Sequence, residues 1–269
     1  MLLILILKNP MASPHLFPWP QRLTVMALTF AWGLSLPVLA QTKSAVQWYN
    51  DGVDKLASQN FSGAIADFTE SIKLNDQDAD AYYNRGYAKH VLGQYQAAIT
   101  DYNQAISLNP EFAFALGNRC YAYFLLSQYD KAIQDCSNAI EINPNYADFY
   151  VYRGNSQSQL GNETTAIADY NDAIRINAKH ANAYYNRALT HNRLGQDQQA
   201  LADYNQSIQL DPDSAEAYFN RGLTQYRLGD EPKAIADLTK AAALFNAQEK
   251  KDMAQKAEAI LTQIRAIEA

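Results

Sequence analysis

The sequence predicts an all-helical solenoid, a stack of six helix-turn-helix units of 34 residues each. An Ala recurs every 34 residues, with no insertion or deletion, at Ala45, Ala79, Ala113, Ala147, Ala181 and Ala215. Nearly the same text follows several of these positions, as in residues 81–86 and 217–222. Each unit also carries two apolar patterns of helical spacing, separated by a short break. A strict period of this length indicates a repeat protein in which each unit packs only on its neighbours.

The N-terminal 40 residues differ from the rest of the chain. They contain Lys8, Arg22 and no acidic residue, followed by a short apolar run that ends at Ala40. This pattern predicts a secretory signal cleaved after Ala40, and therefore an exported protein in the periplasm or another extracytoplasmic compartment. An uncleaved membrane anchor is the alternative, although a full span needs about 20 apolar residues. Either of the first two methionines fits as the start.

Two helices are expected in every unit, as the second unit illustrates. A first helix is predicted over 79–92, ended by Gly93, because Gly readily adopts the backbone conformation that terminates a helix. A second helix is predicted over 95–108, ended by Asn109 and Pro110, because the residue before Pro is disfavoured in a helix. The six units together make one domain over residues 41–248.

The last segment, residues 249–269, carries apolar side chains on one helical face. It predicts a C-terminal capping helix, since the last unit of a stack needs a cover for its apolar end. A helix for dimerisation or membrane contact is the alternative.

Small and aromatic residues recur at fixed places in the units. In the second unit they are Tyr82, Gly86, Ala98 and Tyr102, followed by Pro110. Over residues 45–248 this pattern resembles the tetratricopeptide repeat (TPR) family. The resemblance implies a right-handed α-solenoid whose concave groove binds a protein or peptide. The chain departs from the family at the seventh position, where the family usually has Leu and this chain has Arg.

Two charged columns run through the repeats. Units two to six have Arg at the seventh position, and all six units have Asp at the twenty-third. The first unit has Asp51 in place of the Arg, so we expect each Arg to reach the Asp of the preceding unit, as in an Arg85–Asp67 pair. Such a pair can fix the register between units. A row of ligand-binding Arg side chains is the alternative.

The resemblance places several recurring polar and aromatic residues in the groove. An Asn column at the sixth position would pair with the backbone amides of an extended peptide, and aromatic side chains would provide contact area. Hydrogen bonds to a neighbouring helix, or a solvated face, are equally open for the Asn column, and some aromatics must pack between helices. The candidate groove residues are Asn50, Asn84, Asn118, Asn186, Asn220, Tyr49, Tyr83, Tyr87, Tyr121, Phe124, Tyr185, Phe219 and Tyr226.

The only two cysteines, Cys120 and Cys136, both lie in the third unit, one on each predicted helix. A close helix crossing in an exported chain predicts a disulfide between them. Two buried free thiols are the alternative. Two cysteines without further ligands do not predict a metal site.

Charge and motifs narrow the class of function. The chain has a net charge of −6, and removal of residues 1–40 would leave 20 basic and 28 acidic residues, a net charge of −8. Such a chain is a poor ligand for nucleic acid. No catalytic motif is present, so we expect no catalytic residue and no cofactor. The prediction is a protein- or peptide-binding scaffold in the assembly of an extracytoplasmic complex. A self-associating structural component of the cell envelope is the alternative.

Overall fold

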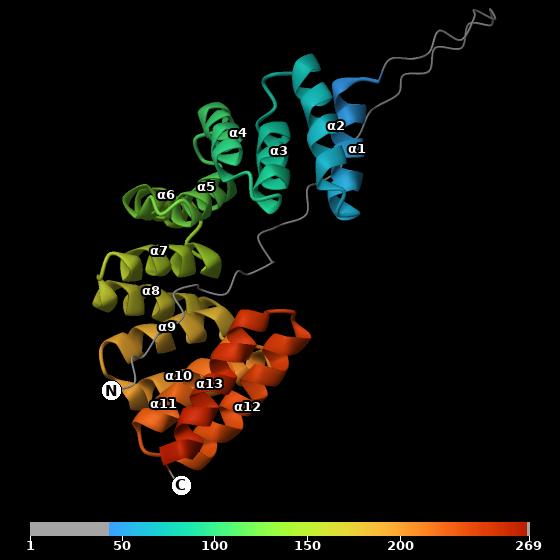
Figure 1. Ribbon diagram of the computed structural model, residues 1–269. Helices are drawn as coiled ribbons and strands as arrows, with labels where there is room; N and C mark the ends of the chain where they lie inside the picture. The colour runs from blue at the N-terminus through green and yellow to red at the C-terminus, as the bar shows by residue number, and fades with distance from the viewer. Residues whose placement is uncertain (1–42, 268–269) are drawn as a thin grey trace, which may run out of the picture. The chain divides into compact units, whose positions relative to one another are not determined.

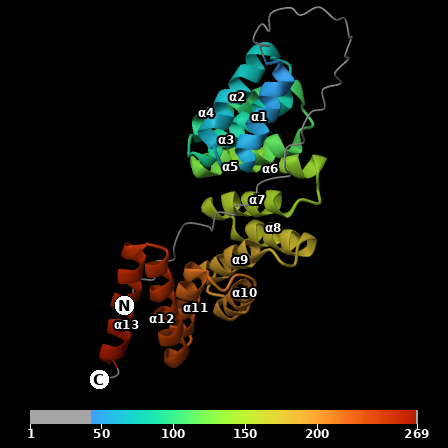
Figure 2. The ribbon, with the colours of Figure 1, turned by 90° about the vertical axis from the view of Figure 1, so that its right-hand side faces the viewer.

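The structure is a computed structural model that describes residues 43–267, and the predicted signal sequence (residues 1–40) lies outside them. Within that range the chain is helical, with no strand. The helices divide into two compact units, residues 43–143 and 144–267. Consecutive helices lie side by side as hairpins (Figure 1), and Figure 2 shows the same pairs from a second direction.

The N-terminal unit contains three hairpins. They are α1 (Ala45–Ala57) with α2 (Phe61–Leu74), α3 (Ala79–Val91) with α4 (Tyr95–Leu108), and α5 (Ala113–Leu125) with α6 (Tyr129–Ile142). The C-terminal unit contains three more and a last single helix. They are α7 (Ala147–Gln159) with α8 (Glu163–Ile176), α9 (Ala181–Arg193) with α10 (Asp197–Leu210), α11 (Ala215–Arg227) with α12 (Glu231–Ala247), and then α13 (Lys251–Ile267).

Each first helix begins at the predicted Ala, because a side chain or turn just before it satisfies the free backbone N–H groups. Ser44 accepts from the backbone N–H of Gln47, while the Gln47 side chain accepts from that of Ser44. The turns within the hairpins need a left-handed backbone, and Gly93 supplies it with φ of +74°. In the first and third repeats Gln59 and Ser127 take this conformation instead, both with φ of +58°.

Successive first helices contact one another within each unit, α1 with α3 and α3 with α5, and likewise α7 with α9 and α9 with α11. We call α1, α3 and α5 the N-terminal first-helix layer, and α7, α9 and α11 the C-terminal first-helix layer. The second helices pack behind them, and fully buried Ala and aromatic side chains such as Ala98 and Tyr102 fill the space between.

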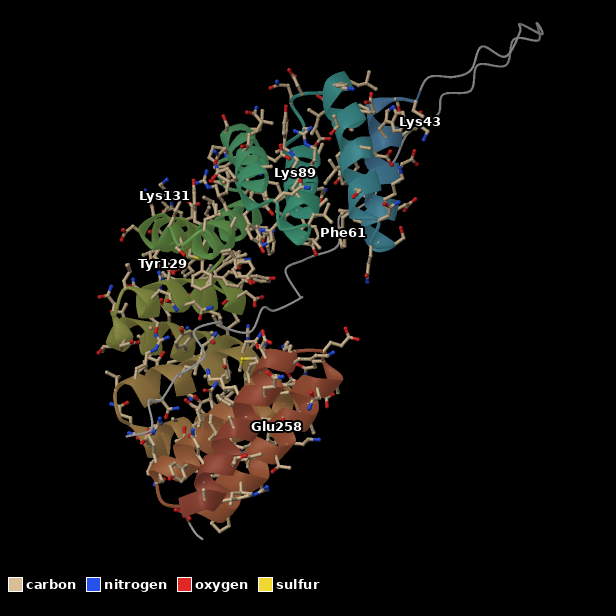
Figure 3. All side chains as sticks on the ribbon, in the orientation of Figure 1. Lys43, Phe61, Lys89, Tyr129, Lys131 and Glu258 are labelled. Carbon is tan, nitrogen blue, oxygen red and sulfur yellow. A yellow bond between two sulfur atoms is a disulfide. The ribbon has the colours of Figure 1, made fainter. Side chains whose placement is uncertain are left out.

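The closing helix α13 lies beside α12 in both views (Figures 1 and 2). Its buried residues Ala257, Leu261 and Ile264 join one apolar cluster with Phe219 of α11 and Phe245 of α12. Glu258 lies on its exposed face (Figure 3). The apolar stripe of α13 is therefore used to cover the end of the last hairpin.

Candidate functional site

The Arg and Asp columns pair within a repeat, so the predicted Arg85–Asp67 contact is wrong. The Arg85 guanidinium donates to Asp101 of its own hairpin, with Nη2 2.7 Å from Oδ1 and Nε 3.0 Å from Oδ2. The same pairing over 16 residues recurs at Arg119–Asp135, Arg153–Asp169, Arg187–Asp203 and Arg221–Asp237. The cause is the helix crossing, which brings residues 16 apart to the same level in every hairpin.

The remaining guanidinium nitrogen makes the link between repeats. Nη1 of Arg119 donates to the Asn103 side chain of the preceding repeat at 2.8 Å, and Nη1 of Arg221 donates to Asn205 at the same distance. The first repeat has no Arg because Lys55 neutralises Asp67, with the two charged groups 2.6 Å apart. These Arg side chains are bound within the protein and do not form a ligand-binding row.

Most of the Asn column is also bound within the protein. The side-chain amides of Asn84, Asn118 and Asn220 are 1–3% exposed, and each donates to the hydroxyl of the Tyr 35 residues earlier. The Nδ2–Oη distances are 3.0–3.2 Å, to Tyr49, Tyr83 and Tyr185 respectively. These three Asn residues therefore join neighbouring first helices, and the predicted contact with a ligand backbone is wrong for them.

Asn186 is the exception in the column. The residue 35 positions before it is Val151, which has no hydroxyl to accept a hydrogen bond. The Asn186 side chain is nevertheless 3% exposed, and neither its Nδ2 nor its Oδ1 has a partner. A buried amide without partners costs about 1–3 kcal/mol, so this side chain stands out within residues 43–267 as one prepared for a ligand.

A small cavity adjoins Asn186 in the C-terminal first-helix layer. Its volume is about 20 Å³, which suits one oxygen-sized atom. Polar groups dominate its wall. The lining residues come from α7, α8 and α9: Asn155, Ser158, Gln159, Tyr170, Asn186, Leu189, Thr190 and Arg193.

Several of these groups are held in place by hydrogen bonds. The Tyr170 hydroxyl donates to Oδ1 of Asn155 at 2.9 Å, and the Thr190 hydroxyl donates to the Asn186 carbonyl oxygen at 2.9 Å. Burial raises the pKa of Tyr170, so its hydroxyl stays protonated and remains a donor. The wall of the cavity is thus rigid, and the Asn186 amide remains the group with both a donor and an acceptor to offer.

The predicted aromatic contacts lie mainly between helices. Six of them are buried, and several make ring contacts with a second helix, as Tyr49 does with Phe68 and Phe219 with Phe245. Half-buried positions among the candidates are Asn50, Tyr87 and Tyr226. The buried ones are Tyr49, Tyr83, Tyr121, Phe124, Tyr185 and Phe219.

The two first-helix layers differ in chemistry. At the twelfth position of the repeats the N-terminal unit has Leu56, His90 and Phe124, whereas the C-terminal unit has Ser158 and Asn192 before Tyr226. His90 is stacked on Tyr121, and burial lowers its pKa to about 4. The candidate groove residues did not include Asn155, Ser158 or Arg193. A signal for them existed, because Val151 interrupts the Tyr–Asn pattern beside the same cavity.

Cys120 and Cys136 form a disulfide that joins α5 to α6. It replaces the small and aromatic residues that meet at this crossing in other repeats, such as Gly86 and Tyr102. Over residues 43–267, no group of three or more His, Cys, Asp or Glu side chains is arranged to hold a metal ion. None of the helices in that range is long and apolar enough to span a membrane.

The stacked hairpins define this protein as an α-helical repeat scaffold. Sequence profiles described as tetratricopeptide repeat match residues 79–112, 113–146, 136–168 and 215–248, and one described as TPR repeat matches 191–229. Together these matches span more than half of the chain, which therefore belongs to the tetratricopeptide repeat family. A protein-binding scaffold is the class of function that this fold supports.

Solved structures share the fold. A chain of the Cut9–Hcn1 hetero-tetramer is 18% identical, with a TM-score of 0.71 over 82% of this chain and 42% of its own. PilF of Pseudomonas aeruginosa is 15% identical, with a TM-score of 0.68 over 80% and 96%. YrrB, described as a TPR protein with an unusual peptide-binding site, is 22% identical, with a TM-score of 0.54 over 71% and 97%. At these identities the likeness shows the fold alone. No curated protein matches the sequence significantly.

Proposed function

We propose that this protein is an extracytoplasmic scaffold that binds an extended segment of a partner protein on its C-terminal first-helix layer. The Asn186 amide is the observation that carries the proposal. An amide with a free N–H and a free C=O is complementary to the C=O and N–H of a peptide backbone, which can satisfy both ends at once. The cavity beside it accommodates the oxygen of a peptide carbonyl group.

The rest of the Asn column supports this assignment by contrast. Asn84, Asn118 and Asn220 already donate to Tyr hydroxyls, so they have no need of a ligand. Because only Val151 breaks this arrangement, the site is confined to the contact of α7 and α9. A peptide crossing this layer would be held at one polar point and would contact half-buried side chains such as Tyr226 on either side.

An extracytoplasmic location is supported by the Cys120–Cys136 disulfide and by the signal-like pattern that ends at Ala40. Disulfides persist in oxidising compartments and are rare in the cytosol. The self-associating alternative receives no support from α13, because its apolar face is packed against α11 and α12. N-terminal sequencing of the protein isolated from its cells tests the location. A mature start at Gln41 is expected, and a chain retained whole in the cytosol would refute it.

The binding site is tested with a random-peptide display library selected on the full chain. The peptides recovered are then labelled, and their affinities are measured by fluorescence anisotropy. Asn186→Leu has a similar volume but no amide, and should weaken binding about tenfold, the value of one or two neutral hydrogen bonds. Unchanged affinity in a variant with wild-type melting would refute the site.

Val151→Tyr and Val151→Phe form a matched pair. The tyrosine hydroxyl should reach Asn186 as Tyr185 reaches Asn220, so this variant should gain stability and lose peptide affinity together. Phenylalanine adds the same ring without the hydroxyl and separates the bond from bulk. Equal affinity of the Tyr and Phe variants would argue against a role of the Asn186 amide in binding.

A further inference from the structure

We infer that the ligand of the Asn186 cavity carries a carboxylate, which Arg193 binds. This inference rests on the proposed function and names the chemical class of its ligand. Arg193 lines the same cavity and is 24% exposed. A guanidinium at this place can bind a carboxylate through two parallel hydrogen bonds, while Asn186 binds the amide next to it.

A comparison of two equivalent arginines carries the argument. Arg227 stands 34 residues after Arg193, at the same place in the next repeat. Its Nε and Nη2 hold both carboxylate oxygens of Asp197 at 3.0 and 2.6 Å, and Nη2 also donates to Asn192. The binding edge of Arg227 is therefore fully used inside the protein.

The same edge of Arg193 is free. Its contacts run through Nη1, which donates to the hydroxyl and the carbonyl oxygen of Ser158. The carboxylate equivalent to Asp197 is Glu163, and it lies farther away, with Oε1 3.5 Å from Nη1. Glu163 instead accepts from the Ser158 hydroxyl at 2.8 Å. The Nε and Nη2 groups of Arg193 thus make no hydrogen bond in a side chain that lines the cavity.

The electrostatic setting agrees with this reading. The positive charge of Arg193 acts on Tyr170 and on Tyr185, and in both cases it opposes the rise in pKa that burial causes. Its field therefore reaches the cavity wall, where water is largely displaced and an ionic hydrogen bond is stronger than at an open surface. A carboxylate can come from an Asp or Glu side chain of the partner or from its C-terminus.

Three small capped probes distinguish these sources by NMR titration of the full chain. N-acetyl-Asp-N-methylamide has a side-chain carboxylate, N-acetyl-Ala has a terminal one, and N-acetyl-Asn-N-methylamide is the neutral control. The signals followed are the side-chain amide of Asn186 and the Nε–H of Arg193. We expect one of the acidic probes to bind about tenfold more tightly than the neutral one, as a charge-assisted hydrogen bond implies.

Arg193→Gln should remove this preference while the neutral probe still shifts Asn186. Arg227→Gln is the matched control, and the preference should persist in it, because Arg227 already binds Asp197. Equal affinity of acidic and neutral probes at Asn186 would overturn the acidic ligand but leave the peptide site. No shift of Asn186 with any probe would overturn both.

Discussion

His90 should make the N-terminal unit sensitive to acid. The side chain is buried in α3, stacked on Tyr121 with ring centroids 5.3 Å apart and edge-on to Tyr95 at 5.2 Å. Its Nδ1 has no hydrogen-bond partner. Loss of hydration in this aromatic setting lowers the pKa of His90 from 6.5 to about 4, because the charged form is disfavoured there.

The sign and size of the effect follow from proton linkage. Between pH 6.5 and 4 the unfolded chain binds a proton at this position and the folded chain does not. The contribution is therefore fully present above pH 6.5 and is lost as the pH falls through this window. A difference of 2.5 pKa units corresponds to about 3 kcal/mol of unfolding free energy at pH 4. This is a large share of the usual stability of a domain.

His90→Phe keeps an aromatic ring at this position, as Phe124 provides in the next repeat, and removes the titration. Urea unfolding of wild type and variant at pH 7.5, 6, 5 and 4 gives the difference in unfolding free energy, in which other acid-titrating groups cancel. We expect the difference to shift in favour of the variant by about 3 kcal/mol from the highest to the lowest pH. A difference that does not change with pH would refute the argument.

Three further predictions concern the packing of the repeats. Replacing both Cys120 and Cys136 by Ser should cost about 3 kcal/mol in urea unfolding, whereas a Gly and Tyr pair, as the second repeat has, should recover most of it without sensitivity to reductant. Equal stability of the two double variants would contradict this. In a double-mutant cycle, Tyr49→Phe and Asn84→Leu should show coupling of about 1 kcal/mol, and additive effects would deny their bond a role. Removal of residues 251–269 should lower Tm and cause self-association, seen by light scattering, because Phe219 and Phe245 become exposed. A truncated monomer with unchanged Tm would contradict the capping role.

The Arg and Asp columns illustrate what a repeating pattern leaves open. Their presence was evident from the sequence, but a column of each type fits pairing within a repeat and pairing between repeats equally well. The absence of Arg in the first repeat favoured the wrong choice, since Lys55 takes its place there. The Cys120–Cys136 pair has the same 16-residue separation as Arg85–Asp101, so applying that spacing to the Arg column would have indicated the correct partner.

The sequence by itself determined the helical hairpins, their starts and the closing helix, because a strict period and an apolar face are local properties of the chain. The cysteine pair could also be predicted, since two substitutions in one repeat point to one helix crossing. Only the tertiary structure decided which members of the Asn column are free. The partner of each Asn lies 35 residues away on the neighbouring first helix, and its availability depends on whether a single hydroxyl is present there. Val151 leaves Asn186 open in this way, and the free edge of Arg193 beside it likewise depends on where Glu163 lies in space.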